Sequence, residues 1–329
     1  MSASAFKLSR ADGAREVKIL GGALALLMVA AYLSFTKKEE SVSAEKVTIL
    51  EVKPEQLKGI SMITRTQTIA FERRKSATGE DYPWFTIESN KKKRGFKGNK
   101  STTGMIESFA PFSALRTLGA DVVGDQLAET KLDRPESKLI LRVGNGDKVF
   151  EVGGRTFGTR DYYLRAAGGK EIYLVASKNL ADLEFPESRF MQRQVKEIET
   201  KDVTSVLLKA GNKEKRFLQQ NRLSSKDAFW AAQETPEAKS ETFENYLHKV
   251  ESLSASGYVE ESAISGAAKV LEISWHEEEK AKETLIIYRG GEPGKEKYYG
   301  VSTTTVMPVE LPKTSTEQVE QDLASVLAE

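Results

Sequence analysis

Hydrophobic residues follow two patterns along this chain. Near the N-terminus, seventeen uncharged residues run from Ile19 to Phe35 without a polar face, whereas from Val47 onward apolar and polar positions mostly alternate. At about 1.5 Å per residue, a helix over the first run measures about 26 Å, close to the roughly 30 Å of a bilayer core. Alternation with a period of two is typical of half-buried strands. The pattern therefore predicts a transmembrane helix over residues 19–36, followed by a strand-rich region.

The charges around the apolar run indicate its orientation. Four basic residues precede it and two follow it: Lys7, Arg10, Arg15 and Lys18, then Lys37 and Lys38. This bias favours a cytoplasmic N-terminus over residues 1–18, a tether over 37–46, and a periplasmic location for the bulk of the chain, at a bacterial inner membrane. A cleaved signal peptide ending near residues 29–31 is the alternative. The long, mixed-charge segment before the run favours an uncleaved anchor.

Strands and one amphipathic helix occur twice in the same order, at a spacing near 140 residues. In each copy a tryptophan strand follows two earlier strands, with Pro83–Thr86 matching Phe229–Ala232. The fold class predicted is α+β, with two tandem β-rich domains over residues 47–190 and 191–329. Each would be an antiparallel sheet with one long helix, and the second would end in a short helix over Thr314–Ala328. We expect both matched tryptophans to lie in the core.

Apolar residues recur at helical spacing after each tryptophan strand. The two stripes comprise Phe109, Phe112, Leu115 and Leu118 in the first copy, and Phe243, Leu247, Val250 and Leu253 in the second. Pro111 must kink or begin the first of these helices. Each copy then closes with a strand meander that carries a tyrosine pair, and one ring of each pair should be buried. Gly153-Gly154 and Gly290-Gly291 are interpreted as turns.

Composition and motifs give little support for catalysis. The chain has no cysteine, only two histidines and a net charge of +1, which argues against disulfides, thiolate metal sites and general nucleic-acid binding. His248 lies within a predicted helix, and His276 opens a charged run interpreted as a solvated turn. No nucleophile, metal-protease or phosphate-loop motif is present. We predict no enzymatic activity, no catalytic residue, no cofactor and no metal.

A basic stretch over residues 90–100 is the clearest candidate for a contact site. It carries six positive charges and no acid, and is expected to form a mobile hairpin tip or loop. Such a patch could contact anionic lipid, an envelope polymer or an acidic partner. An exposed tyrosine of each meander could join it. The candidate contact residues are Lys91, Lys92, Lys93, Arg94, Lys97, Tyr162, Tyr163, Tyr298 and Tyr299.

Two short motifs resemble an uncharacterised envelope family, domain of unknown function 4340. The first is Leu132-Asp133-Arg134-Pro135 before a strand, and the second is Tyr162-Tyr163-Leu164-Arg165 within the meander. The resemblance covers about residues 47–195, with Lys131 where the family usually has glycine. Members are often encoded beside ABC-transporter permeases of the gliding-motility type. The resemblance therefore implies an accessory membrane protein with a β-rich periplasmic region.

These observations lead to one functional hypothesis and two alternatives. The hypothesis is a single-pass, membrane-anchored periplasmic interaction protein, associated with an ABC-type permease or another inner-membrane protein. The first alternative is a binding module for envelope glycan or anionic lipid, with a cell-wall polymer as partner. The second, less favoured, is an envelope hydrolase, which would need a carboxylate pair or a nucleophile in a cleft.

Overall fold

The structure is a computed structural model that describes residues 46–76, 79–144, 146–224 and 226–329. The predicted cytoplasmic segment, the transmembrane helix over 19–36 and most of the tether lie outside these described residues. Among the described residues, no helix is both long and apolar enough to cross a membrane. The anchor therefore stays a prediction from sequence.

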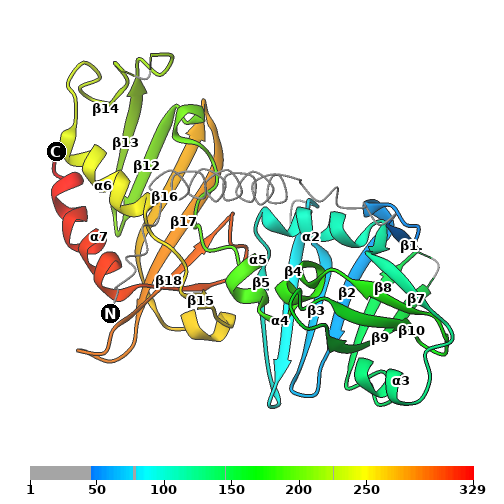
Figure 1. Cartoon of the computed structure of the whole chain (residues 1–329). Coiled ribbons are helices and arrows are strands. Elements are labelled where there is room, and N and C mark those ends of the chain that lie inside the picture. Colours follow the sequence, from blue (N-terminus) through cyan, green and yellow to red (C-terminus); the bar gives the residue numbers. More distant parts are fainter. Residues whose placement is uncertain (1–45, 77–78, 145, 225) are drawn as a thin grey trace, which may run out of the picture. The chain divides into compact units, whose positions relative to one another are not determined.

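Two large antiparallel sheets organise the chain from Val47 to Glu329, which forms one compact unit (Figure 1). The first has nine strands in the order β5-β4-β3-β2-β8-β9-β10-β11-β7. Their bounds are β2 Leu57–Ile63, β3 Gln67–Lys75, β4 Asp81–Ser89, β5 Lys92–Lys97, β7 Arg116–Gly119, β8 Ser137–Val143, β9 Gly146–Arg155, β10 Tyr162–Ala166 and β11 Ile172–Val175. A small separate sheet pairs β1 (Val47–Leu50) with β6 (Phe112–Ala114).

The second large sheet has eight strands in the order β14-β13-β12-β16-β17-β18-β19-β15. Their bounds are β12 Ser205–Ala210, β13 Lys213–Gln220, β14 Phe229–Ala232, β15 Gly257–Tyr258, β16 Ala268–Glu277, β17 Lys280–Gly290, β18 Lys297–Ser302 and β19 Val309–Leu311. This order matches that of the first sheet strand for strand, from β4 through β7. Among the described strands of the two large sheets, only β5 has no counterpart, and the small β1–β6 sheet is a further addition in the first half.

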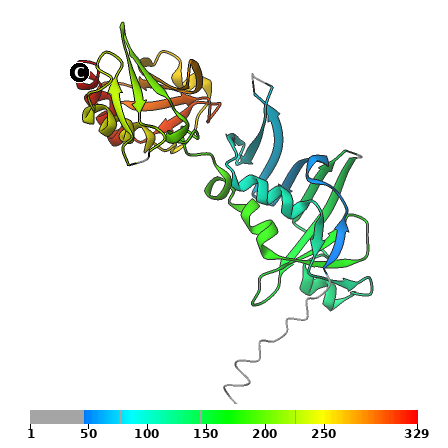
Figure 2. The same ribbon diagram turned by 90° about the horizontal axis from the view of Figure 1, so that it is seen from above.

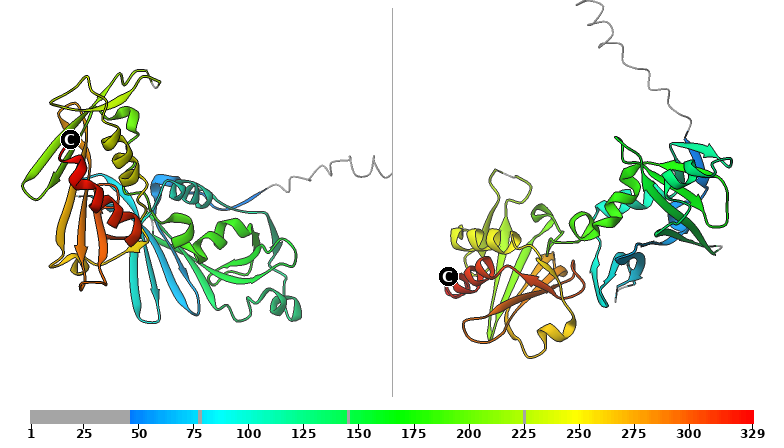
Figure 3. Two further views of the ribbon diagram at one scale, coloured as in Figure 1. Left: turned by 90° about the vertical axis from the view of Figure 1, so that its left-hand side faces the viewer. Right: turned by 60° about the horizontal axis from the view of Figure 1, so that its bottom comes forward.

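Helices pack against each sheet, and most of them cover a hydrophobic core on one face. The first set comprises α2 (Ser101–Phe109), α3 (Asp125–Thr130), α4 (Ser177–Glu184) and α5 (Pro186–Phe190). The side chains of α2, α4 and α5 enter the first core, and Figure 2 shows α2 beside α4. The second set comprises α6 (Glu241–Glu251) and α7 (Lys313–Val326), which lie side by side on the second sheet (Figure 3).

Local sequence explains why α6 forms where the apolar stripe predicts it. The Ser240 hydroxyl accepts a hydrogen bond from the Phe243 N–H, which caps one of the unpaired amides at the helix start. Glu241 and Glu244 lie in the first turn, and His248 and Lys249 lie in the last. Acidic residues near the start of a helix and basic residues near its end interact favourably with the helix dipole. The α+β class, the rich antiparallel β content and the C-terminal helix are confirmed.

The long first helix is a wrong prediction. Helix α2 ends at Phe109, and Phe112 belongs to strand β6. Ala110 precedes a proline and has an extended backbone (φ −146°, ψ 92°), because the proline ring clashes with a helical residue before it. The apolar residues after Pro111 thus continue as strand. Their spacing of three and four residues does not reflect a helix.

The basic stretch over residues 90–100 is also different from the predicted loop. Only Asn90 and Lys91 form a turn, both with positive φ, as a two-residue type I′ hairpin requires. The following residues form β5, which pairs with β4 at the edge of the first sheet. Gly153 and Gly154, interpreted as a turn, instead lie inside β9.

Matched sequence positions place the two tryptophans on different faces of their sheets. Trp230 lies opposite Gln219 and belongs to the second core, as predicted. Trp84 lies opposite Glu72, the neighbour of the core residue Phe71, so its side chain points away from the first core. The cause is a pairing register that differs by one residue between the two hairpins, because a one-residue shift reverses every side chain. Trp84 is buried, as predicted, but it lies outside the main cluster of the first core.

Candidate binding groove

A groove of about 590 Å³ lies between an edge of the first sheet and an edge of the second. One wall consists of residues from β3, β4 and β5, among them Arg74, Trp84, Lys93, Arg94 and Gly95. The opposite wall comprises Tyr258 of β15 and the residues Glu260, Ala263 and Met307. Each wall therefore contains the end strand of its sheet, and we call this space the β5 groove.

Trp84 forms the aromatic floor of the β5 groove. Its ring is 6% exposed and lies edge-on to the Tyr258 ring, with 6.2 Å between the ring centroids. The Arg74 guanidinium lies 4.5 Å from the Trp84 ring centroid, a cation–π contact. Gly95 leaves room for the indole, because a Cβ there would lie 2.6 Å from the Trp84 ring. The indole is thus held in place by three neighbours.

Positive charge predominates on the groove walls. Arg74, Lys93 and Arg94 contribute three cations, against the single carboxylate of Glu260. Arg74 is paired with Glu72 at 2.7 Å, and Arg94 with a glutamate of α5 at 2.6 Å. Lys93 is exposed and has no ion pair within the described part of the chain. An anionic group entering the groove would therefore meet Lys93 first.

The backbone of β5 also faces the groove. The Gly98 N–H donates to Pro83 O at 2.8 Å. This bond identifies Lys97 and Trp84, which lie opposite each other, as a non-hydrogen-bonded pair of the β4–β5 ladder. Such pairs alternate along an antiparallel ladder, so Gly95 and Lys93 have the same arrangement. Their N–H and C=O groups point away from β4. Across residues 46–329, outside the masked positions, no hydrogen bond engages these outward groups.

The second wall is fixed at both ends. The Tyr258 hydroxyl donates to Gln192 O at 3.1 Å, and burial raises the pKa of this phenol. Next to Met307, Val306 has a positive φ of 65°. A β-branched residue in that region is strained, and such strain gathers at functional sites. Strain beside the groove is consistent with a wall that is shaped for contact.

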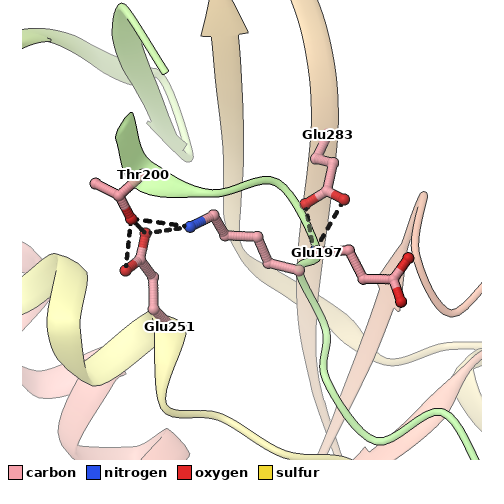
Figure 4. A network of polar contacts seen from close by, with 5 residues as sticks. Glu197, Thr200, Glu251 and Glu283 are labelled. Carbon is pink, nitrogen blue, oxygen red and sulfur yellow. Dashed lines mark hydrogen bonds and ion pairs between the residues drawn. The ribbon is translucent and has the colours of Figure 1, made fainter. Parts of the chain in front are cut away.

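A chain of polar contacts connects β5 to the second sheet below the groove, and Figure 4 shows its far end, where Glu283 lies beside Glu197. Lys97 Nζ donates to Thr304 O at 2.5 Å, and the Thr304 hydroxyl donates to Glu283 at 2.8 Å. Both Glu283 oxygens accept from the Glu197 N–H, at 2.9 and 3.0 Å. Burial lowers the pKa of Lys97, and the nearby carboxylates of Glu197, Glu283 and Glu80 oppose this shift. The network holds one end of β5 against the second sheet.

The predicted contact residues separate into two groups. Lys93 and Arg94 line the groove, while Lys91 and Lys92 lie exposed at the hairpin end and Lys97 belongs to the polar network. None of the predicted tyrosines lines the groove. Tyr162, Tyr163, Tyr298 and Tyr299 all lie in the meanders of the two sheets.

The tyrosine pairs satisfy the burial prediction only in the first copy. Tyr162 is buried and donates to Glu184 at 2.8 Å, while Tyr163 is half-exposed. Tyr298 and Tyr299 are both buried, with 2% and 9% of their surface exposed, so the prediction is wrong for this pair. Burial and a hydrogen bond to a carboxylate on α7 raise the pKa of Tyr298 to about 12.

His276 is also different from its sequence interpretation. It lies within β16 and is 8% exposed, so it is not part of a solvated turn. Among the described residues, neither ring nitrogen has a hydrogen-bond partner, and burial lowers the pKa of the imidazole. Within the described ranges, no group of three or more His, Asp or Glu side chains is arranged to hold a metal ion.

Sequence reasoning missed most of the groove. Trp84, Tyr258 and Met307 were not singled out as contact residues, and they come together from distant parts of the sequence. The one signal that pointed here was the run of basic residues in β5. Counting the residues of the β3–β4 hairpin would have suggested the face on which Trp84 lies.

The fold and the groove define an antiparallel α+β protein in which a cationic sheet edge faces an aromatic floor. A family model for a domain of unknown function, DUF4340, matches residues 103–272, which is more than half of the 329 residues. The protein belongs to this family. The match begins in α2 and ends in β16, so it includes parts of both large sheets, rather than residues 47–195 as the motifs indicated. No curated protein and no solved structure gives a significant match.

Proposed function

We propose that this protein is a non-enzymatic interaction protein of the bacterial cell envelope. Residues 19–36 would hold it in the inner membrane, and the region from residue 47 onward would work in the periplasm as an accessory of an ABC-type transporter. The β5 groove carries the proposal, because it combines an unsatisfied sheet edge, an aromatic floor and excess positive charge. The genomic association of the family with transporter permeases supports the choice of partner.

Binding is favoured over hydrolysis by the composition of the groove. Among the described residues that line it, Glu260 is the only carboxylate. Most glycoside hydrolases use a pair of carboxylates on either side of the scissile bond. Aromatic and arginine side chains, by contrast, are enriched where proteins bind partners. The repeated strand order further suggests tandem domains over 47–190 and 191–329, with β5 added to the first as a contact element.

The test is a purification of the tagged full-length protein from native membranes in mild detergent, with co-purifying proteins identified by mass spectrometry. Lys93→Glu reverses the charge at the groove, and Lys213→Glu makes the same change at an exposed hairpin of the second sheet. We expect ABC-type permease subunits with the wild type and with Lys213→Glu, and their loss with Lys93→Glu. Absence of any transporter subunit from the wild-type sample would contradict the proposal.

A second candidate function is favoured by the aromatic floor. The Trp84 and Tyr258 rings, next to three cations, also suit an acidic envelope glycan or anionic lipid headgroups. Binding of the full-length protein to peptidoglycan sacculi or to anionic liposomes would support it. Such binding should fall steeply with salt, because exposed charges are screened over about 10 Å at 0.1 M.

A further inference from the structure

We infer that the β5 groove binds an extended acidic polypeptide segment, which adds to the first sheet as a tenth strand beside β5. This inference rests on the proposed function and identifies the chemistry of the partner. The site is one that strand addition requires: an edge strand with outward backbone donors and acceptors, and space beside it. Lys93 and Gly95 provide those outward groups, and the groove of about 590 Å³ provides the space.

The sheet ends support the choice of β5 over the other edges. β5 is the only strand without a counterpart in the repeated order of the two sheets. Its far end is already occupied, because Lys97 O accepts from the Gln192 N–H at 2.8 Å. The part of the edge that is free of backbone partners therefore lies toward Lys93. A segment entering from the open side would extend a ladder that the protein has begun with its own backbone.

The side chains of the groove define the sequence that would fit. Residues of an added strand opposite Lys93 and Gly95 are two positions apart, so their side chains share one face. The side chain opposite Lys93 should be acidic, since like charges directly opposite are destabilising. The side chain opposite Gly95 would meet the Trp84 ring, which covers that glycine, and should be apolar. For a segment antiparallel to β5, as all strand pairs of this sheet are, the expected motif from N- to C-terminus is an apolar residue, any residue, then an acidic residue.

The cationic edge also explains how other strands are excluded. Charged side chains on an edge strand oppose pairing with a second copy of the same strand. Lys92, Lys93 and Arg94 would repel another β5 and would accept only a segment of opposite charge. The same residues thus prevent aggregation and select the partner.

The experiment uses the full-length protein in detergent and a synthetic probe, the acetylated amide Thr-Glu-Thr-Val-Thr-Glu-Thr. A matched probe carries N-methyl groups on the glutamate and valine amides, which removes the ladder donors and leaves the charge unchanged. Binding is followed by the change in tryptophan fluorescence, since Trp84 lines the groove whereas Trp230 and Trp275 belong to the second core. Hydrogen exchange is measured at the Lys93 and Gly95 amides.

We expect the unmodified probe to bind and to slow hydrogen exchange at both amides at least tenfold. Its affinity for the protein should be at least tenfold higher than that of the N-methylated probe. Lys93→Glu should weaken binding about fivefold or more, because it replaces a favourable charge pair by an unfavourable one. Lys213→Glu, which lies outside the groove, should not weaken it. These results together would support strand addition.

Three outcomes would overturn the inference, and each differs from failure of the proposed function. Equal binding of both probes would show a charged groove without strand addition. Binding of an acidic oligosaccharide, with neither peptide binding, would favour the glycan function. Binding of nothing, while Lys93→Glu still abolishes transporter co-purification, would leave the accessory function standing and reject the peptide motif. Binding of the probe without co-purification of any transporter subunit would support the peptide motif and reject the accessory function.

Discussion

A buried ion pair joins Lys196, in the segment before the second sheet, to Glu251 at the end of α6. Removing it tests how much this pair contributes to the stability of the second sheet. Lys196 Nζ lies 2.7 Å from Glu251 Oε1 and 3.2 Å from Thr200 Oγ1 (Figure 4). The two charged side chains are 8% and 19% exposed. Lys196→Met removes the cation and keeps most of the apolar stem, so the main loss is the partner of a buried carboxylate.

The size of the effect follows from this burial. Breaking a buried pair by removing one partner costs about 3–5 kcal/mol, because the other charge stays without compensation. Glu251 keeps the Thr200 hydroxyl and some solvent, so we expect the low end, about 3 kcal/mol. A domain of this size loses about 2–4 °C of melting temperature per kcal/mol, which gives a decrease of about 6–12 °C.

The assay is thermal and denaturant unfolding of the full-length protein, with a double variant and a surface control. Lys196→Met with Glu251→Leu should recover most of the loss, since replacing both charges by apolar groups is often neutral. Lys201→Met breaks an ion pair with Glu199 whose side chains are 70% and 67% exposed, and should change the free energy of unfolding much less, because solvent screens this pair. Equal losses for Lys196→Met and Lys201→Met, or no recovery in the double variant, would refute the reasoning.

Three further predictions concern backbone space, backbone strain and pH. Gly153→Ala places a Cβ 2.3 Å from Thr130 O and should cost about 1–3 kcal/mol in denaturant unfolding, because backbone must shift. Val306→Gly should raise stability by about 1 kcal/mol, since it relieves a left-handed backbone at 65°. Hydrogen bonds from Lys313 and the backbone lower the pKa of Glu296 to about 2, so its stabilisation is complete above about pH 4.5 and is lost as pH falls toward 2; Glu296→Gln should remove that loss.

Each of these predictions has its own control. A Cβ at Gly144 would have no atom within 4 Å, so Gly144→Ala should leave the free energy of unfolding nearly unchanged. Equal losses of stability in Gly144→Ala and Gly153→Ala would reject the close-contact argument. A loss of stability in Val306→Gly would mean that its side-chain packing outweighs the strain. For Glu296→Gln, unfolding curves that keep the wild-type dependence between pH 4.5 and 2 would assign that dependence to other carboxylates.

Periodicity along the chain was enough to predict most strands and the second-half helices. The meander strands β8 to β11 and the helices α6 and α7 lie where alternation or helical spacing places them, because each of these patterns reports a face that is buried locally. The break at Pro111 was also visible in the sequence, but its consequence was misjudged. An apolar residue every three or four positions fits a helix only when the backbone can continue it.

The candidate site depended on features that local patterns do not contain. Whether Trp84 faces the core or the groove is decided by one residue of pairing register, which depends on hairpin length and on the strand opposite. The edge position of β5 depends on the absence of a further strand beside it in the sheet.

The sequence by itself therefore determined most strands, the second-half helices, the family and the basic character of residues 90–100. Only the tertiary structure decided that these basic residues form an edge strand and that Tyr258 and Met307 face it across a groove. The physical reason is that secondary structure reports the burial of one face within a few residues. A binding site is made from side chains and backbone groups that long-range pairing brings together.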